Sequence, residues 1–134
     1  MKKIVLLLLI SVGLISCYSH QESKTDSKPN TAQRQPATVQ RVTAKIQGYD
    51  IHDYPVQLEA GKLLNVGLAS KNRFVYFNIL PPNSETAIFN GSINGLQFER
   101  VVQQSGEYRI RVYLMRAEAR RNGVAEYGLE IIHN

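Results

Sequence analysis

The chain has 134 residues and a formal net charge of +5, with 16 Lys+Arg against 11 Asp+Glu. Most of the positive excess lies near the amino terminus, because residues 41–134 hold 11 Lys+Arg and 9 Asp+Glu. The high net charge is therefore no evidence for nucleic-acid binding, and the single cysteine excludes an internal disulfide.

The first residues are typical of a secretory signal. Two lysines precede an apolar run over residues 4–15, which is too short for a membrane span of ~20 residues. The run ends at Leu14-Ile15-Ser16-Cys17, which looks like a lipobox, the processing site of bacterial lipoproteins. We therefore expect a lipoprotein signal peptide over residues 1–16 and a lipid on Cys17, whose acyl chains would anchor the chain to a membrane.

The residues after Cys17 predict a location and a tether. Tyr18 stands where, in lipoproteins of this kind, Asp favours inner-membrane retention, so the resemblance points to the periplasm and the inner leaflet of the outer membrane. Residues 17–40 are rich in Ser, Gln, Lys, Thr, Asn and Pro and hold few apolar side chains, so they predict a flexible tether. Residues 41–134 remain for one folded domain with one core.

The domain alternates apolar and polar residues with period two, which predicts half-buried strands. Turn dipeptides such as Ala60-Gly61, Asn90-Gly91 and Ser105-Gly106 separate these runs. We expect an all-β fold, an antiparallel β-sandwich of about eight short strands. A fuller apolar run over residues 74–80 predicts a central strand buried on both faces, and the one candidate helix is Met115 to Arg121.

Asp50, His52 and Asp53 bring two carboxylates and an imidazole together, which are groups that bind metals. In a strand, however, Asp50 and His52 point to one face and Asp53 to the other. We therefore favour a polar strand edge over a metal site, and we expect no cofactor. The sequence has no nucleophile elbow and no phosphate loop, so an enzyme is the least expected class.

Ser105-Gly106-Glu107-Tyr108 lies at the turn into the strongest predicted strand. One interpretation is structural, with Gly106 supporting the turn and Tyr108 beginning the strand as a structural corner. In the other, Ser105 projects from a loop tip with Tyr108 beside it, and both present hydroxyls to a partner.

Five arginines lie in and after the same strand, and Arg109 and Arg111 share the strand face opposite the core. The cluster is formed by Arg109, Arg111, Arg116, Arg120 and Arg121. It is either a solvated face paired with Glu118, Glu126 and Glu130, at ~0–1 kcal/mol per exposed pair, or a surface that meets carboxylates or phosphates.

Several of these segments together resemble the periplasmic lysozyme inhibitors. They are residues 75–82, 87–91 and 105–116, followed by Ala119-Arg120-Arg121. The run Tyr-Arg-Ile-Arg-Val-Tyr-Leu-Met-Arg over residues 108–116 is the most specific part, and the resemblance covers most of residues 46–132. It is closest to the inhibitors of invertebrate-type (i-type) lysozyme, with the goose-type (g-type) inhibitors as a related second choice.

The resemblance implies an inhibitor that pushes a loop into the cleft of a host lysozyme, where a pair of carboxyl groups cleaves peptidoglycan. Ser105 and Tyr108 would then hydrogen-bond to the catalytic acids, and Gly106 would let the backbone fit the cleft. We add that the five arginines include further contacts to this acidic site. Relatives with this fold can pair, which implies a homodimer as a further partner.

The alternative is a non-inhibitory module that binds glycan or an envelope partner, using exposed aromatic rings. Tyr49, Tyr54, Tyr76 and Tyr113 are available for this, although several should lie in the core. A protruding Ser105 with a reachable Tyr108 would favour inhibition, and burial of both would count against it.

Overall fold

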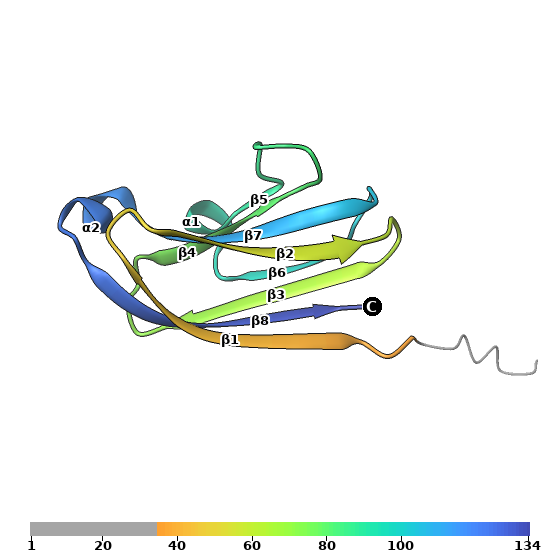
Figure 1. Cartoon of the computed structure of the whole chain (residues 1–134), viewed down its shortest axis with the longest axis horizontal. Coiled ribbons are helices and arrows are strands. Elements are labelled where there is room, and N and C mark those ends of the chain that lie inside the picture. Colours follow the sequence, from red (N-terminus) through yellow and green to blue (C-terminus); the bar gives the residue numbers. More distant parts are fainter. Residues whose placement is uncertain (1–34) are drawn as a thin grey trace, which may run out of the picture. The chain divides into compact units, whose positions relative to one another are not determined.

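The structure is a computed structural model that describes residues 35–134. Eight strands form two four-stranded sheets, one with the order β1-β8-β3-β6 and the other with the order β2-β7-β4-β5 (Figure 1). The strands are β1 (Thr38–Gln47), β2 (Ile51–Leu58), β3 (Leu63–Ser70), β4 (Val75–Leu80), β5 (Phe89–Asn90), β6 (Gln97–Val101), β7 (Gly106–Leu114) and β8 (Val124–His133). All pairings are antiparallel, so the predicted β-sandwich is confirmed.

The predicted signal peptide over residues 1–16 and the lipidation site Cys17 lie outside the described residues, as does most of the predicted tether. The folded part begins slightly before the predicted boundary at residue 41, because β1 starts at Thr38, which pairs with His133 of β8. Within residues 35–134, neither helix has the length and apolarity that crossing a bilayer requires.

The period-two pattern of the sequence forms the core between the sheets. In β8, for example, Ala125, Tyr127, Leu129 and Ile131 are buried, and the residues between them face outward. The strand predicted to be buried on both faces is β4. The prediction holds for its inner face and only in part for its outer face. Its outward side chains Tyr76 and Asn78 are half-buried, because they lie on the open face of the β2-β7-β4-β5 sheet.

Two short helices interrupt the strands. Helix α2 (Arg116–Arg120) forms where the sequence predicted a helix from Met115 to Arg121. Helix α1 (Gly91–Asn94) was predicted only as turns, and the side chain of Asn90 caps it by accepting a hydrogen bond from the Ser92 amide at 3.1 Å.

The sandwich has two ends that differ in structure. At the loop end, residues 59–62 and 102–105 lie side by side, since the Gly61 amide donates to the Val102 carbonyl at 2.8 Å and the Val102 amide donates to the Lys62 carbonyl at 2.8 Å. At the α2 end, the Gly48 amide donates to the Gly123 carbonyl at 2.9 Å. Strand β7 runs between these ends (Figure 1).

The described chain begins and finishes at the loop end. Lys62, in the β2–β3 turn, donates a side-chain hydrogen bond to Gln35, near the first described residue. The amide of Leu63 donates to the side-chain oxygen of Asn134 at 3.1 Å. The first and last described residues therefore lie beside the loops and away from α2.

Candidate functional site

The β6–β7 turn exposes Ser105 at the loop end, which agrees with one of the two interpretations of the sequence. The Oγ atom of Ser105 accepts a hydrogen bond from the Ala60 amide at 2.9 Å, which ties the turn to its neighbour. Gly106 has φ +138, and a Cβ built on it would lie 2.8 Å from two carbons of Pro82. Both the backbone conformation and the contact with Pro82 therefore require glycine at this position.

Tyr108 lies in the core, where it is only 2% exposed. Its hydroxyl donates to the carbonyl of Gln104 at 2.8 Å, which closes the turn below Ser105. A direct hydrogen bond from Tyr108 to the acids of a lysozyme needs an accessible hydroxyl, so that expectation does not fit this structure. The structural-corner interpretation of the sequence describes the position of Tyr108 correctly.

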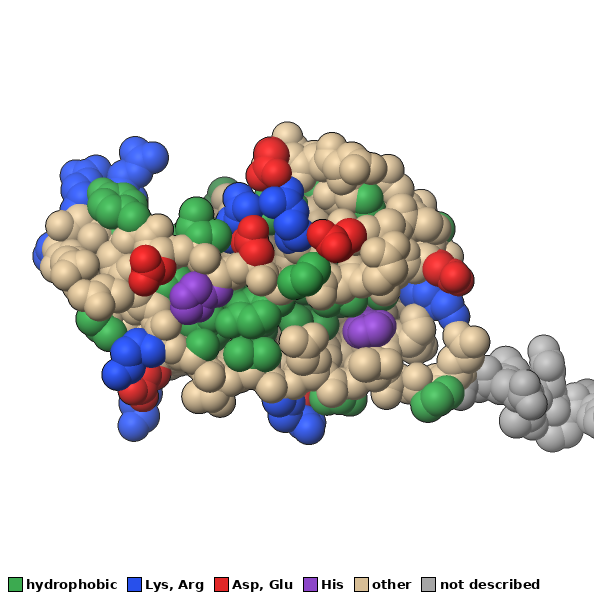
Figure 2. All heavy atoms as spheres, viewed as in Figure 1, with side chains coloured by type: hydrophobic (Ala, Val, Ile, Leu, Met, Phe, Trp, Pro, Cys, Tyr) green, Lys and Arg blue, Asp and Glu red, His purple; other side chains and the backbone are tan. Residues whose placement is uncertain are grey.

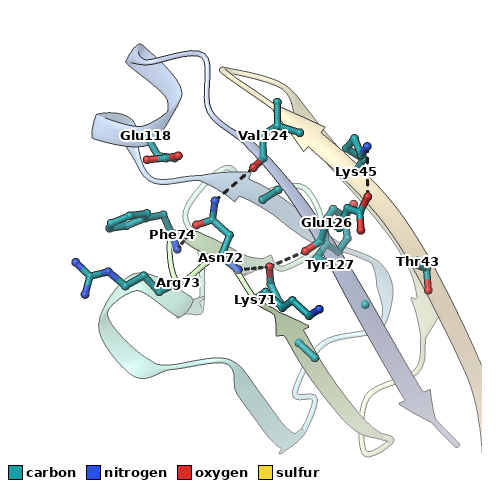
Figure 3. A pocket seen from close by; sticks show the side chains of 14 residues that line it. Thr43, Lys45, Lys71, Asn72, Arg73, Phe74, Glu118, Val124, Glu126 and Tyr127 are labelled. Atoms are coloured by element: carbon teal, nitrogen blue, oxygen red, sulfur yellow. Dashed lines mark hydrogen bonds and ion pairs between the residues drawn. The ribbon is translucent and has the colours of Figure 1, made fainter.

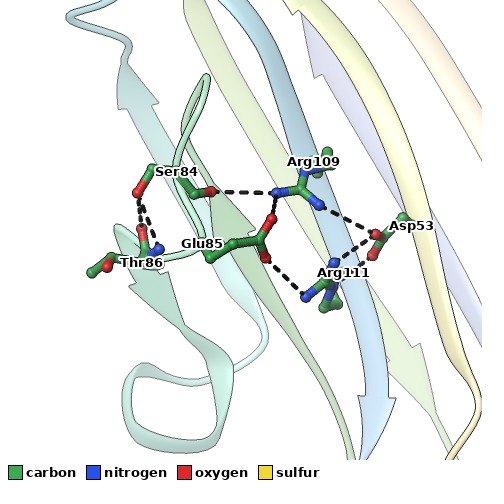
Figure 4. A network of polar contacts seen from close by, with 6 residues as sticks. All are labelled: Asp53, Ser84, Glu85, Thr86, Arg109 and Arg111. Carbon is green, nitrogen blue, oxygen red and sulfur yellow. Dashed lines mark hydrogen bonds and ion pairs between the residues drawn. The ribbon is translucent and has the colours of Figure 1, made fainter.

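Arg109 and Arg111 project from the outer face of β7, but carboxylates of the same chain surround them (Figure 4). Arg111 binds Asp53 with two hydrogen bonds of 2.8 Å, from Nε and from Nη2. Arg109 donates to Glu85 at 2.5 Å and to the Ser84 carbonyl at 3.3 Å. This network pairs both arginines of the strand face with carboxylates and fastens the β4–β5 loop to the sheet.

The pKa shifts follow from these contacts. The hydrogen bond from Arg111 lowers the pKa of Asp53, and the hydrogen bond from Arg109 lowers the pKa of Glu85. In return, the hydrogen bond to Asp53 raises the pKa of Arg111. Both carboxylates thus stay ionised to lower pH than usual, and the network persists at neutral pH.

Of the three carboxylates that the sequence suggested as partners of the five arginines, only Glu118 pairs with one of them. Glu130 binds Arg41 at 2.6 Å, and Glu126 lies 3.3 Å from Lys45. Glu118 binds Arg121 at 2.5 Å. The predicted pairing is therefore confirmed for Glu118 with Arg121 and wrong for Glu126 and Glu130, and the strand register sets Asp53, which was not predicted as a partner, directly opposite Arg111.

The α2 end presents cations that are not neutralised. Arg116 and Arg120 are exposed, and among residues 35–134 neither forms an ion pair. They lie four residues apart in α2, so their side chains leave the same side of the helix. Figure 2 shows blue side chains projecting at this end, whereas blue and red side chains are intermixed over the sheet.

The predicted site residues therefore divide between two ends. Strand β7 has nine residues, which at ~3.3 Å per residue places its ends roughly 25 Å apart. Ser105 and Gly106 lie at one end, and Arg116, Arg120 and Arg121 lie at the other. The sequence analysis treated these residues as one site. The length of the strand between them already implies two separate surfaces.

His52 belongs to a hydrogen-bonded cluster between the sheets and not to a metal site. Its Nδ1 lies 2.7 Å from the hydroxyl of Tyr127, which lies 2.6 Å from the hydroxyl of Tyr54. Burial raises the pKa of Tyr127, so this phenol stays protonated. Asp53 faces outward to Arg111, and no group of three His, Cys, Asp or Glu within the described range could hold a metal ion.

A hollow of about 1010 Å³ lies at the α2 end between the β3–β4 loop and β8 (Figure 3). Its polar groups bond mainly to each other. Asn72 accepts from the Phe74 amide at 2.9 Å, and Ser70 donates to the Glu126 carbonyl at 2.6 Å. Arg73 lies over the ring of Phe74, 4.9 Å from its centroid. These contacts hold the β3–β4 loop in place.

No protein-family model matches the chain, and no curated protein matches it by sequence. Solved structures that share its fold include three inhibitors named PliG. PliG of Aeromonas hydrophila, a periplasmic lysozyme inhibitor of g-type lysozyme, has a TM-score of 0.66 and 27% identity, over 73% of this chain and 88% of its own. In fold and in sequence, this chain is similar to the periplasmic lysozyme inhibitors.

Two further PliG structures support the fold. PliG of Salmonella Typhimurium has a TM-score of 0.58 and 24% identity, over 72% of this chain and 91% of its own. A mutant of PliG from Escherichia coli has a TM-score of 0.59 and 21% identity, over 75% of this chain and 92% of its own. The predicted resemblance to lysozyme inhibitors is confirmed. All three PliG proteins are inhibitors of g-type lysozyme and none is an enzyme, whereas the sequence placed i-type first.

Proposed function

We propose that this chain is a periplasmic protein that inhibits a lysozyme, with g-type lysozyme as the first target to test and i-type as the second. The observation that carries this proposal is the similarity to the Aeromonas hydrophila inhibitor in both fold and sequence. The domain is nearly the same size as that inhibitor, since the match covers 88% of it. The i-type preference rests only on the sequence resemblance.

The charge distribution supports one surface over the other. Glycoside hydrolases cleave with a pair of carboxyl groups, so a blocking surface gains from unpaired guanidinium groups that can bind them. Arg116 and Arg120 offer such groups at the α2 end, whereas Arg109 and Arg111 already bind Asp53 and Glu85. We propose that the α2 end makes the charged contacts.

The loop end is the surface that the family resemblance implies. Ser105 is exposed there, and because its Oγ accepts from Ala60, its own hydrogen remains available to donate. Glu107 is exposed beside it, however, and a carboxylate is repelled from an acidic cleft. The proposed role of Tyr108 is to position this turn from below, through its bond to Gln104.

The proposed location is the periplasmic side of the outer membrane, through a lipid on Cys17. It rests on the sequence of residues 1–18. Labelling cells with a radioactive fatty acid, in parallel with a Cys17→Ser variant, checks this. Incorporation into the natural chain but not the variant is the expected result.

Self-association also stays a prediction, and light scattering of the purified protein measures it.

The experiment that tests the function is the residual activity of g-type, i-type and chicken-type lysozymes on cell walls, with increasing amounts of the purified protein. We expect saturable inhibition of at least one type, strongest for g-type. Inhibition of i-type alone would overturn the order of targets and keep the function. Full activity of all three types would leave the alternative, a non-inhibitory module that binds another envelope partner.

A further inference from the structure

The outer face of the β2-β7-β4-β5 sheet has an apolar row beside a polar row. Strand register sets Ile51 and Tyr76 on either side of Tyr113, which makes the apolar row. The next row consists of Asp53, Arg111 and Asn78. Because alternate residues of a strand share a face, both rows point away from the core.

A hollow of about 440 Å³ opens where these rows meet the β1–β2 turn. Its walls include Tyr49, Ile51, Asn78, Tyr113 and Arg116. Tyr49 is 68% exposed and Ile51 is 56% exposed, so both present apolar surface at the mouth of the hollow. The size is in the range of small-molecule sites, ~300–1,000 Å³. We call this hollow the β7 groove.

The polar groups of the β7 groove are oriented and still available. The Tyr113 hydroxyl donates to Oδ1 of Asn78 at 3.1 Å, and the Gly91 amide donates to the same oxygen at 3.3 Å. These bonds fix the amide and leave its Nδ2 without a partner among residues 35–134. In the same part of the chain, the exposed side chains of Asp50 and Arg116 have no ion pair.

We propose that the β7 groove binds a saccharide that carries a carboxylate. The negative face of an aromatic ring attracts the C–H groups of a sugar ring, so Tyr49 and Tyr113 supply the stacking surface. The Asn78 amide donates to a hydroxyl or an acetamido carbonyl, and Asp50 accepts from hydroxyls. Arg116 pairs with the carboxylate. N-acetylated, carboxylate-bearing amino sugars of the cell wall have this chemistry.

A neutral sugar and an extended polyanion both fit less well. A neutral sugar leaves the Arg116 guanidinium without a counter-charge. A polyanion needs several free cations in line, and the neighbouring Arg111 is held by Asp53. This binding activity does not depend on lysozyme inhibition, although Arg116 would serve both, so a test without any lysozyme separates the two proposals.

The experiment is cosedimentation of the purified protein with lysozyme-free peptidoglycan sacculi. Isothermal titration with a soluble disaccharide of N-acetylglucosamine and N-acetylmuramic acid follows. We expect retention on sacculi and binding of the disaccharide. Tyr49→Ala and Arg116→Gln should each weaken binding by about fivefold to tenfold. Arg116→Gln should leave binding of a neutral N-acetylglucosamine oligomer unchanged, because only the acidic sugar has a carboxylate.

Two matched variants control for exposure and charge. Ile93→Ala alters a side chain that is 79% exposed on α1, and Arg100→Gln removes an exposed arginine from β6 on the other sheet. Both should bind like the natural chain. The proposal is overturned by absence of binding to sacculi and disaccharide, or by equal losses in the groove variants and the controls. Circular dichroism of each variant confirms that the fold is retained.

Discussion

The loop end and the α2 end of this domain contrast in how their polar groups are satisfied. At the loop end, Ser105 accepts from Ala60, Tyr108 donates to Gln104, and Gly106 packs on Pro82. At the α2 end, Arg116 and Arg120 are exposed without a paired carboxylate in the described part of the chain. The loop end thus holds its shape through internal hydrogen bonds, and the free cations of the α2 end are the reason why we propose that this end makes the charged contacts.

The largest expected effect concerns the core at the loop end. Tyr108→Ala should lower the free energy of unfolding by about 3–5 kcal/mol, because it leaves a cavity between the sheets. Tyr108→Phe should cost only about 1 kcal/mol, for the lost bond to Gln104. Urea unfolding measures both. If Tyr108→Phe instead abolished inhibition with little loss of stability, the hydroxyl would contact the lysozyme. The loop end, and not the α2 end, would then be the binding surface.

The next effect concerns the α2 end. Replacing Arg116 and Arg120 together by Gln should weaken inhibition of the target lysozyme by about a hundredfold, since each lost charged contact costs about 1.4 kcal/mol, or tenfold. The double variant Arg41→Gln, Arg100→Gln removes the same charge from the other sheet and serves as the control. An equal loss in the control would mean that net charge, and not the α2 surface, governs binding.

A smaller effect is expected at Gly106. Gly106→Ala should destabilise the protein by about 2 kcal/mol, because the added methyl meets both an unfavourable φ and Pro82. Gly61→Ala is the matched control, since Gly61 has φ +89 but no atom within 4 Å of the built Cβ. Thermal unfolding of the two variants separates the contact from the backbone strain. Equal losses would show that Pro82 does not support the turn.

The carboxylate network predicts a pH dependence. The pKa of Asp53 is lowered, so its bonds stabilise the fold above the usual pKa of 3.8, and this contribution disappears as pH falls below that value. Asp53→Asn should therefore destabilise by about 1 kcal/mol at pH 7, a small value because the pair is partly exposed to solvent. Unfolding of both proteins at pH 7 and pH 2.5 should show the difference shrinking in acid. A constant difference would rule out the ionic origin.

The smallest effect is expected for Ser105→Ala. If the α2 end makes the charged contacts, removing this hydroxyl should change inhibition by less than about threefold, which corresponds to one exposed neutral hydrogen bond. Titration of the same lysozyme with natural and variant protein measures it. A loss above about thirtyfold would identify the loop as the inserted element and agree with the family resemblance.

The fold could be predicted because alternation with period two directly records which side chains face the core. The same alternation groups Tyr108 with Ile110 and Val112, and so already indicated that its ring is buried. The predicted contact between Tyr108 and a lysozyme followed the family resemblance and disregarded this local pattern. Asp53 and Glu85 could not be found as arginine partners. Their positions depend on the β2–β7 register and on the course of the β4–β5 loop, which no local pattern encodes.

The described part of the chain begins at the loop end, and this position has a consequence for attachment through that end. Gln35 meets Lys62 there, and α2 lies at the far end of the sandwich. A domain held by its amino terminus would face the holding surface with its loops and direct Arg116 and Arg120 outward. Shortening the segment before Thr38 would move the loop end close to the surface first, while the α2 end would stay accessible.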